Sequence, residues 1–203
     1  MKTDVPNKKK GMASLDLREL ITRYQISNRA EGKSPRTIAW YTEMLMSFSR
    51  YMKVELQRCD LSAFNIDNVR NYIIHLQNKP KFQGHPYTPQ QNKLLSPRTV
   101  QCHVRALKAF ASWLYAEDYT EHNRLQNLKL PKAPSKIIEP LTPQGIKKVA
   151  SSINRNSYSG ERNYAMLVAL LDTGLRASEA AGITLDNLNL KDGYIKITGK
   201  GNK

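Results

Sequence analysis

The chain has 203 residues, of which 40% are hydrophobic and 24% charged, values typical of a soluble protein with one large domain or two small ones. No apolar run approaches the ~18 residues of a membrane span, and the basic start, residues 1–11, does not resemble a secretory signal. We therefore expect a cytoplasmic protein without a membrane partner. The two cysteines and four histidines show no metal-ligand spacing, so neither a metal nor another cofactor is expected.

The charge favours a polyanionic partner. Lys and Arg number 32 against 17 Asp and Glu, which gives a net charge of +15. Basic side chains that neutralise phosphates release counterions, so this balance is typical of nucleic-acid-binding proteins, although ribosomal and membrane-surface proteins share it. Residues 1–140 hold 23 basic and 12 acidic side chains, so most of the excess lies there.

The apolar pattern predicts a helical domain at residues 13–127. Residues 1–12 are read as a flexible basic tail that either touches DNA phosphates or is simply solvated. Four helices follow, at residues 14–28, 35–53, 67–77 and 97–116, each with apolar residues at helical spacing. A long loop rich in Pro and Gly, residues 78–95, separates the third helix from the fourth.

The composition changes after the fourth helix. Residues 128–140, with the sequence LKLPKAPSKIIEP, have linker composition. Beyond them we expect helices from residue 142 and over 161–172, then a strand at 194–198. Residues 141–203 therefore form a second, mixed segment.

A five-residue sequence occurs twice, as SPRTI at residues 34–38 and SPRTV at 96–100. Ser fits a helix N-cap and Pro the first helical position, so each copy starts a helix with Arg36 or Arg98 in its first turn. A helix N-terminus beside an arginine suits a backbone phosphate. Two well-capped helices without any ligand are the alternative interpretation.

The fourth helix carries a polar stripe without acids. Arg98, Gln101, Arg105 and Lys108 fall on one face, with Thr99 in the first turn, while the apolar residues gather on another face. These residue types read base edges and hold phosphates, so the stripe is a candidate DNA-binding surface. A solvated helix face is the alternative, but such faces usually include acidic residues.

The sequence LLDTGLRASE at residues 170–179 is the most specific stretch of the chain. It reads as an apolar helix ended by Gly174, a common residue after a helix C-terminus. Arg176 and Glu179 are three residues apart and can form an ion pair on a following helix. By these residues alone, a structural pair is the simpler interpretation.

This stretch and four other motifs together resemble the tyrosine recombinase (phage integrase) family, in its Xer-like branch. The other motifs are GKGNK at residues 199–203, LKLPKAP at 128–134, LTPQGI at 141–146 and the two SPRT helix starts. The resemblance implies a mainly α chain: a SAM-like four-helix core-binding domain and the N-terminal part of an α/β (α+β) catalytic domain. It implies double-stranded DNA as partner, a tetramer on DNA for complete members, and nucleoid association when bound.

The resemblance also implies roles for three residues. Arg176 aligns with the first catalytic arginine, which holds the scissile phosphate with a bidentate guanidinium. Lys200 aligns with the hairpin lysine, the general acid toward the leaving 5′ oxygen. Glu179 aligns with an acidic residue that supports the site. The chain departs from the family pattern at Ala180, at Asn187 and at Arg124, none of them a catalytic position.

The family's second box, a His-x-x-Arg, and its tyrosine nucleophile are expected beyond Lys203, so no phosphotyrosyl intermediate is expected on this chain alone. Two function hypotheses follow. One is an incomplete site-specific recombinase or integrase, serving phage integration, a mobile element or chromosome resolution. The other is a non-catalytic DNA-binding remnant or regulator that competes for a recombination site. A generic basic nucleic-acid-binding protein is the third interpretation.

Overall fold

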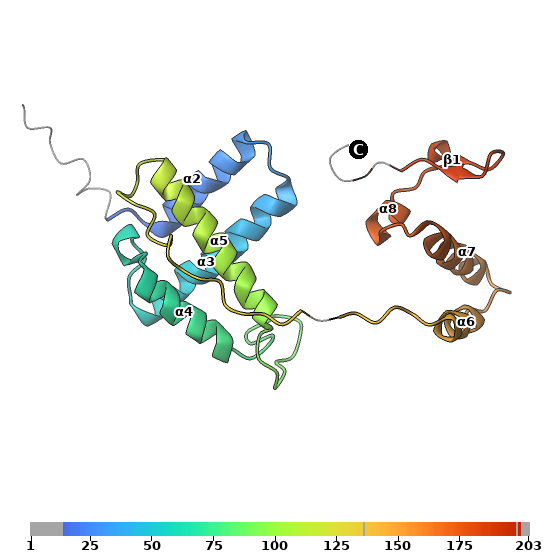
Figure 1. The fold of residues 1–203 in the computed structure, drawn as a ribbon, viewed down its shortest axis with the longest axis horizontal. Helices are drawn as coiled ribbons and strands as arrows, with labels where there is room; N and C mark the ends of the chain where they lie inside the picture. The colour runs from blue at the N-terminus through green and yellow to red at the C-terminus, as the bar shows by residue number, and fades with distance from the viewer. Residues whose placement is uncertain (1–13, 136, 198, 200–203) are drawn as a thin grey trace, which may run out of the picture. The chain divides into compact units, whose positions relative to one another are not determined.

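The computed structural model describes residues 14–135, 137–197 and 199 (Figure 1). The chain forms two compact units, residues 1–135 and 136–203. The predicted tail, residues 1–12, and Lys200 lie outside the described residues. Among the residues described, no helix is long and apolar enough to cross a membrane.

The first unit is a helical bundle, as predicted. Its α-helices are α2 (Leu17–Ala30), α3 (Pro35–Glu55), α4 (Ile66–Asn78) and α5 (Pro97–Ala116), with a 3-10 turn η1 (Leu61–Ala63) between α3 and α4. Each of the four α-helices starts at a polar N-cap whose side chain accepts a backbone hydrogen bond from the first turn; the caps are Asp16, Ser34, Asn65 and Ser96. Such caps satisfy amide groups that a helix start leaves unpaired, and so fix where each helix begins.

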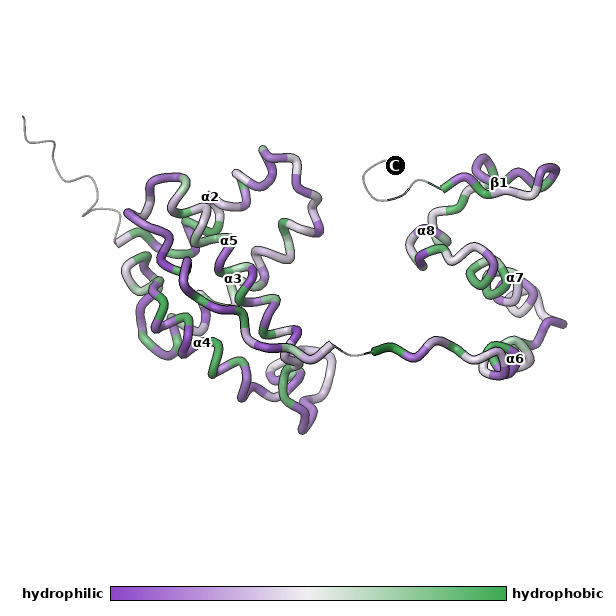
Figure 2. The backbone as a smooth tube through the Cα atoms, viewed as in Figure 1, coloured by the Kyte–Doolittle hydropathy of each residue, from purple (hydrophilic) through white to green (hydrophobic). Residues whose placement is uncertain are grey.

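The core of this unit lies between α5 and its neighbours α3 and α4, and includes an inner face of α2. Figure 2 shows hydrophobic residues recurring along these helices between hydrophilic ones. Aromatic rings meet edge to face at its centre: Phe64 lies 5.8 Å from Phe48 and 5.6 Å from Phe110, centroid to centroid. Burying such a ring supplies about 1.5–3 kcal/mol, as does burying each of the leucines and other aliphatic side chains of this core.

A polar pair, His103 and Tyr72, is buried between α4 and α5. The Nδ1 atom of His103, on α5, lies 3.0 Å from the Tyr72 hydroxyl, which donates to Ser47 Oγ at 3.0 Å. Burial, together with the smaller effect of the nearby Lys79 ammonium, lowers the pKa of His103 to about 4. Burial also raises the pKa of Tyr72 to about 12. Both side chains are therefore neutral at pH 7.

The second unit contains α6 (Pro143–Ser151), α7 (Tyr158–Thr173), α8 (Ala177–Ala181), the 3-10 turn η2 (Leu185–Asn187) and a short hairpin. Its strands β1 (Leu188–Asn189) and β2 (Tyr194–Ile195) pair antiparallel, with Leu188 opposite Ile195. The strand predicted at 194–198 is thus present but shorter in its described part. Its partner β1 was not predicted, because two residues are too few to show the alternation of a strand.

No apolar side chain of the second unit is buried among its described residues. On α7 the side chains of Met166, Val168 and Leu171 are about half exposed, at 53%, 45% and 46%. Figure 2 shows the hydrophobic character of this helix in green. The helices of this unit are therefore held by capping and local hydrogen bonds rather than by a core of their own.

Candidate functional site

Arg176 sits in the tight connection between α7 and α8. Gly174 ends α7 in a left-handed conformation, with φ of +66°, and its amide donates to the Leu170 carbonyl at 3.0 Å. A residue with a Cβ is strained in this conformation, which explains the glycine of the motif. Two residues later Arg176 forms the N-cap of α8 in an extended conformation. The chain thus turns sharply and presents the arginine at the start of a new helix.

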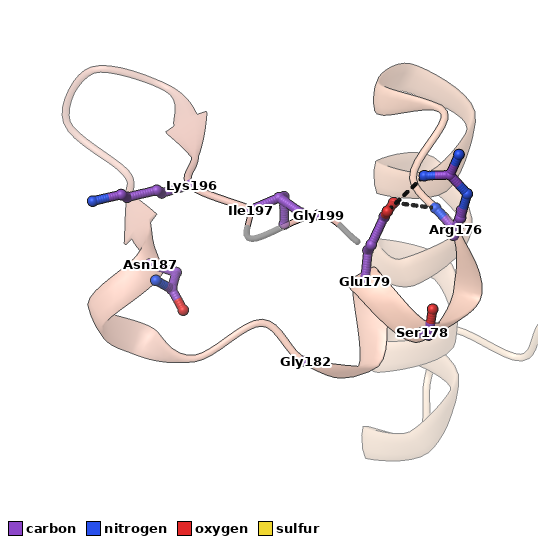
Figure 3. A pocket seen from close by; sticks show the side chains of 8 residues that line it. All are labelled: Arg176, Ser178, Glu179, Gly182, Asn187, Lys196, Ile197 and Gly199. Atoms are coloured by element: carbon purple, nitrogen blue, oxygen red, sulfur yellow. Dashed lines mark hydrogen bonds and ion pairs between the residues drawn. The ribbon is translucent and has the colours of Figure 1, made fainter. Parts of the chain in front are cut away.

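Glu179 holds Arg176 with both oxygens of its carboxylate (Figure 3). Its Oε2 accepts from the Arg176 backbone amide at 2.9 Å, and its Oε1 accepts from Arg176 Nη1 at 2.7 Å. The backbone hydrogen bond from Arg176, and then the guanidinium, lower the pKa of Glu179, so this carboxylate stays charged at neutral pH. The side chain of Arg176 is nevertheless 79% exposed, against 14% for Glu179. The ion pair predicted from the spacing therefore exists, and it leaves most of the guanidinium donors open to a ligand.

Arg176 and Glu179 border an open pocket of about 490 Å³ within the second unit (Figure 3). The pocket also includes residues from α8, η2 and the end of the hairpin: Ser178, Gly182, Asn187, Lys196, Ile197 and Gly199. The Lys196 amide donates to the Asn187 carbonyl at 2.8 Å, which brings the strand end beside η2. The side chain of Lys196 points away from Arg176 in this view. Lys200, the predicted general acid, lies outside the described residues, one position after a residue that lines this pocket.

Sequence reasoning did not single out Ser178 and Lys196, which line the same pocket as the arginine. The signal for Lys196 was its place in the predicted strand at 194–198, close in sequence to the GKGNK motif. Asn187, noted as a departure from the family, accepts from the Thr184 hydroxyl at 2.7 Å and so helps to close η2. Among the described residues no group of three or more His, Cys, Asp or Glu is placed to hold a metal ion.

The two SPRT sequences form matching helix starts in the first unit. Ser34 Oγ accepts from the Thr37 amide at 3.3 Å, and Ser96 Oγ accepts from the Thr99 amide at 3.1 Å. Neither helix has an acidic residue in its first turn. Arg36 is exposed, and Arg98 is exposed with Nη1 3.2 Å from Gln101 Oε1. Both helix starts therefore present a positive end and an accessible arginine.

The polar stripe of α5 divides into two parts. Arg98 and Arg105 are exposed, and Thr99 is partly buried. Gln101 and Lys108 instead contact the chain segment that follows α5: Gln101 Nε2 donates to the Pro131 carbonyl at 2.7 Å. Lys108 Nζ donates to the carbonyls of residues 125, 126 and 128 at 3.2, 3.3 and 2.6 Å. These two side chains hold the start of the predicted linker against α5. This structural role competes with the DNA contact predicted from the sequence, and the two roles have different effects on stability and on salt dependence.

The residue noted as a departure at position 124 has a structural task. Arg124 Nη1 donates to the carbonyls of Leu61, at 2.5 Å, and Phe64, at 3.0 Å. Burial lowers the pKa of Arg124 without removing its charge. A charged donor that satisfies two carbonyls around η1 ties the segment after α5 to the base of the bundle.

Both the second unit and the chain as a whole are similar in sequence to known proteins. Residues 139–203, which contain the Arg176 pocket, match the profile of the Phage integrase family. Tyrosine recombinase XerD of Listeria monocytogenes is 27% identical over 188 residues, covering 93% of this chain and 58% of that protein. Tyrosine recombinase XerD of Halalkalibacterium halodurans is 30% identical over 172 residues, covering 85% of this chain and 53% of that protein. The chain is thus similar to tyrosine recombinases over most of its length.

These matches confirm the resemblance to the tyrosine recombinase family that the motifs predicted. The chain spans slightly more than half the length of the curated relatives it matches. Among solved structures, the integrase from mycobacterium phage Brujita covers 91% of this chain at 20% identity and a TM-score of 0.42, with 55% of that integrase matched. At that score the structural likeness adds nothing to the sequence matches.

Proposed function

We propose that this tyrosine recombinase chain acts on double-stranded DNA in site-specific cutting and rejoining, with Arg176 as the residue that holds the scissile phosphate. The observation that supports the role of Arg176 most is its geometry. Glu179 fixes the backbone and one guanidinium nitrogen of Arg176, while the rest of the guanidinium is exposed at the border of an open pocket. A planar cation that is fixed before the substrate arrives stabilises developing charge on a phosphate without further ordering.

Glu179 is a supporting residue in this proposal. Its carboxylate carries no proton at neutral pH, because the Arg176 amide and guanidinium lower its pKa. It therefore serves as a hydrogen-bond acceptor that orients the arginine rather than as an acid. Lys200 is proposed as the general acid toward the leaving 5′ oxygen, on the strength of the family match over residues 139–203.

The first unit is proposed to hold the duplex. Its accessible candidates are Arg36 and Arg98 at the two helix starts, with Thr99 and Arg105 on α5. Contacts to phosphates from these positions would place the protein on DNA. Assembly as a tetramer on two duplexes, in the cytoplasm and on the nucleoid, is part of the same proposal.

The test of the catalytic role is covalent capture in a version that carries the family's second box and tyrosine. On a nicked duplex containing the recombination site, we expect a phosphotyrosyl adduct that is visible on a denaturing gel. The Arg176→Ala variant should form none while binding duplex with nearly the parent affinity, because the first unit supplies the grip. Adduct formation at the parent rate would reduce Arg176 to a structural residue.

The same gel addresses the second hypothesis. A parent protein that binds the site tightly but never forms an adduct would favour a non-catalytic regulator that competes for the site. The Arg176→Lys variant is the matched control for charge: because Lys lacks the bidentate fork, its adduct yield should fall nearly as far as that of the Ala variant.

A further inference from the structure

The connection between α4 and α5 is much longer than the geometry of two helices needs. It runs over residues 79–96, while connections of more than about 12–15 residues without helix or strand are uncommon and are usually functional or disordered. Residues 79–95, here called the 79–95 loop, extend beyond the neighbouring ends of α4 and α5 (Figure 1). The sequence indicated a loop here, but the function proposed above does not use it.

The base of the 79–95 loop is closed by main-chain hydrogen bonds. The Lys81 amide donates to the Lys93 carbonyl at 2.7 Å, the Leu95 amide donates to the Lys79 carbonyl at 3.0 Å, and Pro80 forms an antiparallel bridge with Leu94. Closure brings the two ends of the loop together beside the start of α5. The loop is therefore an ordered projection.

The tip is also ordered, by an imidazole. His85 Nδ1 accepts from the amides of Tyr87, at 3.2 Å, and Thr88, at 2.9 Å. Asn and Asp oxygens build turns in the same way. This turn places Tyr87 at the surface with 91% of its area exposed. Phe82, by contrast, is partly buried and lines a pocket with Thr99 and His103 of α5, so it anchors the loop to the helix that carries the DNA-binding candidates.

The charge of the loop has one sign. It contains Lys79, Lys81 and Lys93 and no Asp or Glu. The ammonium of Lys81 lies 4.9 Å from the centre of the Phe82 ring, a cation–π contact that keeps it at the stem. An exposed aromatic tip on a basic stem matches a duplex groove, where cations contact the flanking phosphates and an apolar side chain enters between them.

We propose that the 79–95 loop is a second DNA-contact element, in which Lys81 and Lys93 contact phosphates and Tyr87 enters a groove of the duplex beside the α5 contact. The proposal rests on the duplex binding proposed above and adds a contact beyond the two helix starts. Because the cationic stem and the aromatic tip act by different physical forces, their substitutions have separable effects on binding.

The test is fluorescence anisotropy of the full chain with a fluorescein-labelled random-sequence duplex over a series of NaCl concentrations. Lys81→Ala should reduce the slope of log affinity against log salt by about 0.9, the contribution of one phosphate contact. Tyr87→Ala should weaken binding roughly fivefold or more at every salt concentration without changing the slope, because the lost contact is not ionic. His85→Ala should behave like Tyr87→Ala, and His85→Asn should restore binding, because the Asn oxygen accepts the same two amides.

Matched controls lie elsewhere in the same unit. Lys53→Ala removes an exposed lysine near the C-terminal end of α3, and Tyr115→Ala removes a tyrosine that is 51% exposed at the far end of α5. If the parent binds duplex and the loop variants bind as the controls do, the loop proposal is wrong and the proposed DNA binding stands. If the parent itself does not bind duplex, both proposals are wrong.

Discussion

The contacts of Lys108 predict that its substitution costs stability rather than DNA affinity. Lys108→Met keeps the apolar stem but removes the ammonium, which leaves the carbonyls of residues 125, 126 and 128 without their shared donor. Hydrogen bonds to a charged group contribute about 1.5–3 kcal/mol, and the shortest of the three, at 2.6 Å, involves the buried Leu128. We expect a loss of about 2 kcal/mol in the free energy of unfolding.

Urea unfolding followed by tryptophan fluorescence measures this loss directly. Both tryptophans, Trp40 and Trp113, lie in the first unit, so the signal reports on that unit alone. With a dependence of about 2 kcal/mol per molar urea, the midpoint should fall by about 1 M. The DNA salt slope of the variant should stay close to that of the parent.

Arg105→Ala is the matched comparison, from the same polar stripe one turn earlier. Its side chain is exposed, so the free energy of unfolding should stay within about 0.5 kcal/mol of the parent value. The slope of log affinity against log salt for duplex binding should fall by about 0.9. If Lys108→Met leaves the midpoint unchanged and lowers the salt slope as Arg105→Ala does, the assignment of Lys108 to the segment after α5 is wrong.

Three further predictions concern the buried His103, the two carbonyl contacts of Arg124 and the exposed helix α7. The folded pKa of His103, about 4, lies below its unfolded value of 6.5, so its contribution to stability is complete above pH 6.5 and is lost as the pH falls toward 4. Parent stability should drop by about 2 kcal/mol more than that of His103→Gln between pH 7 and 5, as measured by urea midpoints; equal drops would contradict this. Arg124→Ala should cost about 2–3 kcal/mol by the same assay. Arg58→Ala, which removes a 60% exposed arginine from its ion pair with Asp60, should cost less than about 1 kcal/mol; equal costs would refute the role given to Arg124. Hydrogen exchange by mass spectrometry should show α7 amides exchanging roughly tenfold or more faster than those of α5, because α7 has no buried apolar side chain, and equal protection would contradict this.

Much of the first unit could be predicted because its signals are local. The Ser-Pro starts of α3 and α5 and the apolar spacing along each helix lie within a few residues of one another, and the helix starts were placed correctly to within about three residues. The Arg176–Glu179 pair was also local, with a separation of three on a short helix. Such features follow from residues that are neighbours in sequence.

The rest depends on residues far apart in sequence. The helical pattern puts Lys108 on a polar face, but only the folded chain brings the carbonyls of residues 125–128 against that face. In the same way Arg124 reaches carbonyls some sixty positions earlier. Strands β1 and β2 pair through only two residues each, too short a pattern for the pairing to be read before the structure.

Duplex binding by the two matching helix starts is the central claim, and its salt dependence is the most direct test. Anisotropy of the full chain on a random-sequence duplex should show affinity falling steeply as NaCl rises from about 50 to 200 mM. The Arg36→Ala/Arg98→Ala variant should reduce the slope of log affinity against log salt by about 1.8 with an unchanged unfolding midpoint. An absence of binding at low salt, or an affinity that does not change with salt, would contradict the claim.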